Sequence, residues 1–164
     1  MKLKTLAVIL MLFCAAGIAS AQTTYTIYIH GAGVHPGSDK AQAQPIETLF
    51  AQALGRELNS QPYVSSVTLI TPDTHYPEET AYVVLNVFAE PINNHTYVVN
   101  TVILTHAVND TGSFRYHGTA VSIVDLNLVG GVGSAEDPEV PVSLIAAVQH
   151  ARLFFERQAG MPSR

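Results

Sequence analysis

His30, His35 and Asp39 are the residues of this sequence whose types and spacing could do chemistry. They lie in and around a short glycine-rich stretch, Gly31 to Gly37, that follows an apolar segment of β type. Imidazole and carboxylate groups are ordinary ligands for borderline metal ions, and histidine changes its charge near neutral pH. The two spacings, five and four residues, match no established zinc motif and do not by themselves bring the side chains together. The sequence therefore predicts a binding site at these three residues, with no metal and no cofactor assigned.

An enzyme is the alternative interpretation of the same stretch. Ile29-His30-Gly31-Ala32-Gly33 resembles the oxyanion loop of α/β-hydrolases, in which backbone N–H groups stabilise a developing negative charge. The resemblance covers five residues, and the sequence contains no Gly-x-Ser-x-Gly nucleophile motif. No catalytic residue is therefore assigned. A small hydrolase or metal-dependent enzyme centred on the segment from His30 to Asp39 is the alternative function.

Met1 to Ala21 has the pattern of a cleaved export signal. Lys2 and Lys4 precede an apolar run, and Ala19-Ser20-Ala21 is a small-x-small cleavage site. The apolar run is too short to span a bilayer, and no longer one follows. A lipoprotein interpretation would use Cys14, but the bulky Phe13 precedes it. We therefore expect a periplasmic or secreted protein, without a membrane span, that begins near residue 22.

The composition of the expected mature chain excludes several classes of partner and site. Cleavage would remove Lys2 and Lys4 and leave six basic against 13 acidic residues, a net charge of −7. Nucleic acids and anionic membrane surfaces require basic patches, so neither is an expected partner. Cleavage would also remove Cys14, the only cysteine, which excludes disulfides and thiolate metal sites.

Two Asn-x-Thr triplets, at Asn94 and Asn109, fit the acceptor pattern for N-glycosylation. Both fall between apolar, β-rich runs. Asparagine is also one of the residues that tight turns prefer. The turn interpretation is favoured because the short signal led by lysine is typical of bacteria, and glycosylation stays the alternative.

Alternation of residue types predicts one domain over residues 22–164. Strands are expected over 23–30, 64–71, 81–90, 95–106 and 113–129, because runs rich in Val, Ile, Thr, Tyr and Phe lie between turn residues. In the last strand, six residues are expected to share the buried face: Phe114, Tyr116, Ala120, Val124, Leu126 and Leu128. Helices are expected from Pro45 to near Asn59 and from Pro141 to near Gly160. Their apolar positions recur at helical spacing.

The order β-α-β-β-β-β-α predicts an α+β fold in which two helices pack on one face of a mostly antiparallel sheet. Export, a packed core and the lack of a catalytic motif favour a small non-enzymatic binding or accessory protein. We expect its partner to be an envelope or extracellular protein or a small ligand, bound through the sheet, an exposed edge strand or the glycine loops.

Overall fold

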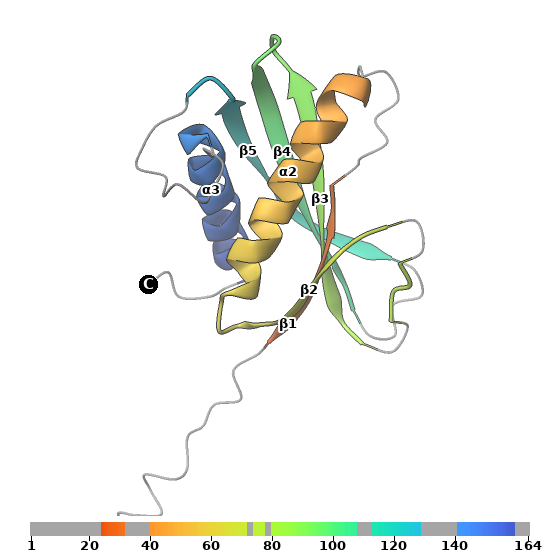
Figure 1. The fold of residues 1–164 in the computed structure, drawn as a ribbon. Coiled ribbons are helices and arrows are strands. Elements are labelled where there is room, and N and C mark those ends of the chain that lie inside the picture. The colour runs from red at the N-terminus through yellow and green to blue at the C-terminus, as the bar shows by residue number, and fades with distance from the viewer. Residues whose placement is uncertain are drawn as a thin grey trace, which may run out of the picture.

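The computed structural model describes residues 24–31, 40–71, 74–77, 80–107, 113–128 and 141–159 (Figure 1). Within these ranges the chain forms five strands and two helices in the predicted order. They are β1 (Tyr25–His30), α2 (Lys40–Asn59), β2 (Val64–Leu69), β3 (Tyr82–Pro91), β4 (Thr96–His106), β5 (Phe114–Asp125) and α3 (Val142–Gln158). Neither of these helices is long and apolar enough to cross a membrane.

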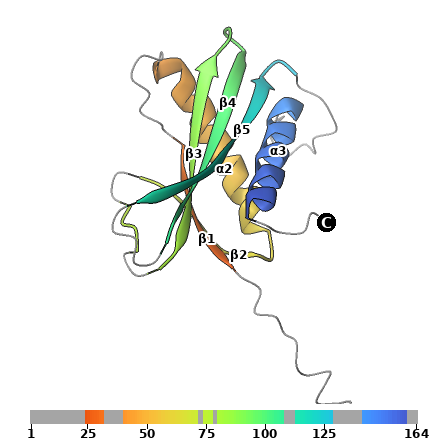
Figure 2. The same ribbon diagram turned by 180° about the vertical axis from the view of Figure 1, so that it is seen from behind.

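The strands form one sheet in the order β2-β1-β3-β4-β5. Strand β1 pairs in parallel with β2 and β3 over short ladders, whereas β3-β4-β5 is a long antiparallel meander. Both helices cover the same face of the sheet (Figure 1). In the view from behind, the strands lie in front of helix α2, so the other face of the sheet is seen (Figure 2). The predicted α+β class and the packing of two helices on a mostly antiparallel sheet are therefore confirmed.

The main core lies between the sheet and the two helices. Ile27 and Ile29 of β1 are fully buried, as their alternation predicts, and they meet Phe50 and Leu54 of helix α2 in one cluster. Strands β3 and β4 add every second residue, and α3 adds Leu144, Ala147, Val148, Ala151 and Phe155. This alternation explains why the core-facing side of β3 and β4 is mostly apolar, with Thr101 as the buried polar exception.

Helix α2 begins earlier than the proline pattern predicts. The expected start was Pro45, whereas the helix begins at Lys40 and includes this proline. A proline inside a helix removes one backbone hydrogen bond. Ala43, in the added turn, is only 2% exposed and belongs to the main core. Packing of this turn against the sheet therefore outweighs the local preference for starting the helix at proline.

A β-bulge in β5 makes the predicted single-face alternation of this strand wrong. Gly118 faces Ile103 of β4, but Tyr116 faces the next residue, Leu104, so His117 is one extra residue. An extra residue shifts all preceding side chains to the other face of the sheet. Ala120 and Val124 are buried under the helices as predicted, whereas Tyr116 is on the face without helices. The strand also ends at Asp125, before the expected end at residue 129.

A buried carboxylate accepts a backbone hydrogen bond from the end of β3. The ladder between β1 and β3 ends at the pair of His30 and Asn86, and beyond it no described strand pairs with β3 on that side. There the backbone N–H of Ala89 donates a 2.8 Å hydrogen bond to Oε1 of Glu47 in helix α2. Both residues are buried. This bond satisfies a backbone donor that would otherwise cost free energy in the core.

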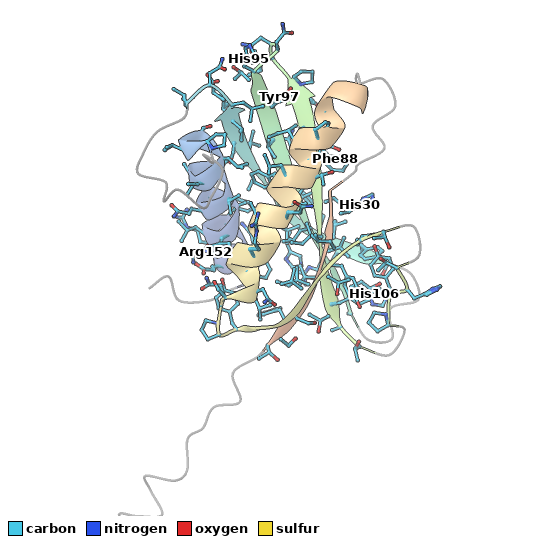
Figure 3. The ribbon with its side chains drawn as sticks, viewed as in Figure 1. His30, Phe88, His95, Tyr97, His106 and Arg152 are labelled. Atoms are coloured by element: carbon cyan, nitrogen blue, oxygen red, sulfur yellow. The ribbon has the colours of Figure 1, made fainter. Side chains whose placement is uncertain are left out.

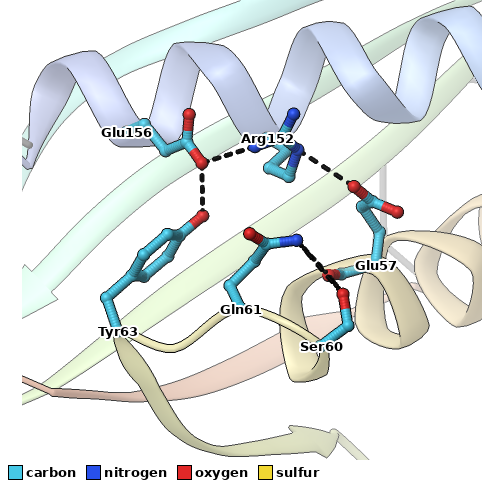
Figure 4. A network of polar contacts seen from close by, with 6 residues as sticks. All are labelled: Glu57, Ser60, Gln61, Tyr63, Arg152 and Glu156. Carbon is cyan, nitrogen blue, oxygen red and sulfur yellow. Dashed lines mark hydrogen bonds and ion pairs between the residues drawn. The ribbon is translucent and has the colours of Figure 1, made fainter. Parts of the chain in front are cut away.

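A polar network joins α2, the start of β2 and α3 (Figure 4). Oε1 of Glu156, which is only 8% exposed, accepts hydrogen bonds from Tyr63 Oη at 2.6 Å and from Arg152 Nη1 at 2.5 Å. Arg152 Nε also lies 3.0 Å from Oε1 of Glu57, an ion pair without hydrogen-bond alignment. Ser60 Oγ donates to the backbone carbonyl of Glu57 at the end of α2. The network therefore holds the two helices and the strand start in register.

Alkaline pH is expected to weaken the fold through Tyr63. Burial, and then its hydrogen bond to Glu156 and the charge of that carboxylate, raise the pKa of Tyr63 far above its usual value. Below about pH 10 the phenol is protonated in both the folded and the unfolded state, so its ionisation does not change the stability with pH. Above that pH only the unfolded chain releases the proton. The free energy of unfolding should then fall by up to about 1.4 kcal/mol per pH unit from this group.

Urea unfolding between about pH 8 and pH 11 tests this expectation with wild type and Tyr63→Phe. The variant should be less stable at pH 8 but should lose stability more slowly as the pH rises. Burial also raises the pKa of Tyr76 and Tyr82, so a residual slope should persist in the variant. Equal slopes for the two proteins would contradict the assignment to Tyr63.

Candidate functional site

The structure describes one of the three residues predicted to form a site. His30 is at the end of β1, partly exposed, and paired in the sheet with Asn86. His35 and Asp39 lie outside the described residues, so the predicted cluster is not tested. Among the described residues, the His30 side chain makes no hydrogen bond or ion pair, and no group of three His, Cys, Asp or Glu residues could hold a metal ion. Figure 3 shows His30 at the level of the sheet, away from Arg152.

The alternative interpretation as an enzyme predicts a reactive side chain with a second polar group within hydrogen-bond distance. The described serine–histidine contact of this kind involves Ser122 of β5, whose Oγ lies 3.0 Å from Nδ1 of His150 in α3. Nucleophilic catalysis needs a third group to orient the histidine and donors for an oxyanion. Within the described part of the chain His150 has no such carboxylate, and the pair is exposed. This contact therefore joins α3 to the sheet and assigns no catalysis.

The face of the sheet opposite the helices, here called the open face, is divided into two parts by the bulge in β5. Side chains of neighbouring strands form rows across this face because partners in a ladder point the same way. From one end to the other, the rows are Tyr82-His106-Phe114, Tyr28-Val84-Leu104-Tyr116, His30-Asn86-Val102-Thr119, Phe88-Asn100-Val121 and Glu90-Val98-Ile123.

Aromatic rings fill the first part of the open face. Tyr82 stacks on Tyr76 at 5.3 Å and on His106 at 4.8 Å, measured between ring centroids. Tyr28 meets both tyrosines, and Phe114 meets His106 edge to face. Tyr28, Tyr82 and Val84 form a second, smaller core against Ile70 and Leu104. Such rings hold the loop after β2 against the sheet.

This aromatic cluster is poorly suited to acid–base chemistry. Burial, and then the proximity of Tyr82 and Tyr28, raise the pKa of Tyr76, and burial likewise raises the pKa of Tyr82. Both phenols therefore stay neutral near physiological pH. Nδ1 of His106 is buried without a hydrogen-bond partner among the described residues. The rings of this cluster pack against one another and against the sheet.

The second part of the open face, together with Tyr116 just before the bulge, exposes apolar side chains. Tyr116, Val121 and Ile123 of β5 are 61%, 54% and 64% exposed. Val98 and Val102 of β4 lie beside them and are partly exposed. We call these five residues the β4–β5 patch. At one end of the patch, Tyr116 Oη lies 3.0 Å from Thr119 Oγ1.

The surroundings of the β4–β5 patch are polar or acidic. Glu90 and Asp125 lie at one end, and Asn100 lies in its middle between Phe88 and Val121. The rows that contain Val102 and Val121 carry no Lys, Arg, Asp or Glu. An apolar centre with a polar margin is the composition that protein-binding surfaces show.

Sequence reasoning missed this surface for a specific reason. It treated β5 as one continuous alternation and left Val121 and Ile123 without a role. Their periodicity does place them opposite the buried Ala120 and Val124. The signal available in the sequence was that Val121 and Ile123, two β-branched apolar residues, lie on the face opposite the core, where an exposed strand usually carries polar residues.

No model of a known protein family matches the sequence, and no curated protein matches it. Among solved structures, the hypothetical protein CT253 from Chlamydia trachomatis is similar to this chain. The two are 11% identical, with 84% of this chain and 97% of that chain covered and a TM-score of 0.38. A similarity this distant supports no inference about fold or function.

Proposed function

We propose that this protein is an exported, non-enzymatic binding module that docks a protein partner on the β4–β5 patch. The observation that carries the proposal is the exposure of Tyr116, Val121 and Ile123 on one face of β5, within a patch of five residues that contains no charged side chain. The export signal at residues 1–21 supports a partner in the envelope or outside the cell.

Physical chemistry favours a protein over a small ligand at this surface. Burying exposed apolar area yields about 25 cal/mol per Å², so a partner must cover a broad area to bind well. The patch lies on the face of a sheet, which an extended apolar surface of another protein can cover. Tyr116 offers a large ring with a polar tip, and tyrosine is enriched among the residues that dominate binding energy. A partner with a matching apolar face therefore fits the patch best.

The substitution Ile123→Asp is expected to abolish partner binding without unfolding the protein. An aspartate there would place an unpaired charge in the buried interface, whereas in the free protein it would remain hydrated. Ile145→Asp is the matched control, because Ile145 is also exposed, at 47%, but lies on helix α3. Chemical crosslinking of the tagged protein in its own cells, with mass spectrometry, measures the captured partner.

Wild type and Ile145→Asp should capture the same dominant partner, and Ile123→Asp should lose it by about tenfold or more. His30→Ala should leave capture unchanged, since His30 belongs to the alternative enzyme site. Equal capture by all variants would show that the β4–β5 patch does not bind the partner. Loss of capture in His30→Ala alone would instead favour the segment from His30 to Asp39.

A further inference from the structure

A second surface lies at the opposite edge of the sheet, between helix α2 and strand β2. It is an open groove of about 500 Å³. Its lining residues come from one side of the helix and from the edge strand: Gln52, Gly55, Arg56, Asn59, Val67 and Leu69. This groove shares no residue with the β4–β5 patch, so what it binds is independent of the proposed function.

The helical wall of the groove carries polar groups at regular intervals. Gln52, Arg56 and Asn59 are exposed and follow one another at single helical turns. Arg56 is the only charged residue of the lining, and it forms no ion pair with any other described residue. The chain as a whole has a net charge of −5, so a cation without an ion pair stands out. It favours the binding of a negatively charged group in the groove.

The floor of the groove is apolar and is set by a glycine. A Cβ atom on Gly55 would lie 3.6 Å from Val67 Cγ1, Leu69 Cδ2 and Ile29 Cδ1. The absence of a side chain at this buried position lets the helix backbone lie close to Val67 and Leu69, which line the groove with it. Leu69 is 41% exposed. An apolar side chain laid along β2 would have a surface to contact.

The outer edge of β2 offers backbone hydrogen bonds. Strand β2 is the first strand of the sheet and pairs only with β1 among the described residues. The N–H of Ile70 donates to the carbonyl of Ile29 at 2.8 Å, so by alternation the N–H groups of Leu69 and Val67 point away from β1. The strand sequence, Val64 to Leu69, contains no charged residue or proline. Such residues are what normally protect an edge from strand addition.

We propose that this groove binds an extended peptide segment that carries a carboxylate. The peptide pairs its backbone with the outer edge of β2 and lays apolar side chains on Val67 and Leu69. Its carboxylate meets the Arg56 guanidinium, and the amides of Gln52 and Asn59 bond the remaining polar groups. Edge pairing supplies affinity, and the charge pair supplies selectivity for acidic segments.

Fluorescence anisotropy tests the proposal with a labelled peptide of alternating valine and threonine that has one central glutamate. A peptide with glutamine at the same place is its neutral counterpart. The purified mature chain is compared with Arg56→Gln and with Arg157→Gln, a matched control for an exposed arginine on α3. The glutamate peptide should bind wild type and Arg157→Gln equally, and Arg56→Gln about tenfold more weakly.

The glutamine peptide should bind wild type and Arg56→Gln alike, because the charge pair is then absent in both. No binding of the glutamate peptide, or an equal loss in the two arginine variants, would overturn the proposal. Methylation of those peptide amides that face β2 should abolish binding, while methylation of the intervening amides should not. Ile123→Asp should bind the peptide as wild type does, which separates this groove from the β4–β5 patch.

Discussion

Replacing Arg152 by methionine is expected to lower the free energy of unfolding by about 2–4 kcal/mol. The substitution keeps much of the apolar stem of the side chain but removes the cation that faces Glu156 and Glu57. Glu156 is buried and would then keep Tyr63 as its one hydrogen-bond donor among the described residues. A buried carboxylate that loses its counterion is costly. Within this range of about 2–4 kcal/mol, we expect a loss of free energy near the lower end, because the arginine side chain is 21% exposed.

Urea unfolding at neutral pH measures the effect, with the slope m as a check on two-state behaviour. The double variant Arg152→Met with Glu156→Leu should be more stable than Arg152→Met, because it removes the charge left unpaired. Arg157→Met, an exposed arginine on the same helix, should change stability by less than about 0.5 kcal/mol. A double variant as unstable as Arg152→Met would show that the network does not act through this charge pair.

Replacing Gly118 by alanine is expected to cost about 1–3 kcal/mol. Its φ of +150° lies in a region that residues with a side chain rarely adopt. A Cβ atom there would also lie 2.9 Å from Cζ of Phe154 in helix α3. The glycine therefore permits both the bulge in β5 and the close approach of the helix to the strand.

A double-mutant cycle with Phe154→Ala separates the two causes. If the backbone conformation dominates, most of the cost of Gly118→Ala should persist when the ring is removed. Gly55→Ala is the control, because Gly55 is in a helix and has ordinary space for a Cβ. That substitution should stabilise by about 0.5–1 kcal/mol. A neutral Gly118→Ala would contradict the strained position of this residue.

Most of the fold could be predicted because local patterns and packing agree. The alternation of Tyr25, Ile27 and Ile29 and the capping proline at Pro141 both predicted elements that the structure contains. The prediction failed where long-range packing overrides local preference. Ala43 is buried by the sheet, which extends α2 before Pro45, and the bulge at His117 depends on the register with β4.

The candidate site was harder to predict because its residues have no chemical signature. Histidine and aspartate attract attention in a sequence, whereas Val121 and Ile123 are ordinary strand residues. Their importance depends on the helices packing on one face only, a property of the tertiary structure. Gln52, Arg56 and Asn59 likewise gain meaning only because α2 lies beside the edge of β2.

Site-specific photo-crosslinking tests the central claim, partner docking on the β4–β5 patch, most directly. A photoreactive amino acid replaces Ile123 in one protein and Gln149, an exposed residue of α3, in another. Illumination in the native cells should give one discrete crosslinked product from position 123 and none from position 149. The same product from both positions, or a product from position 149 alone, would contradict docking on the open face of the sheet.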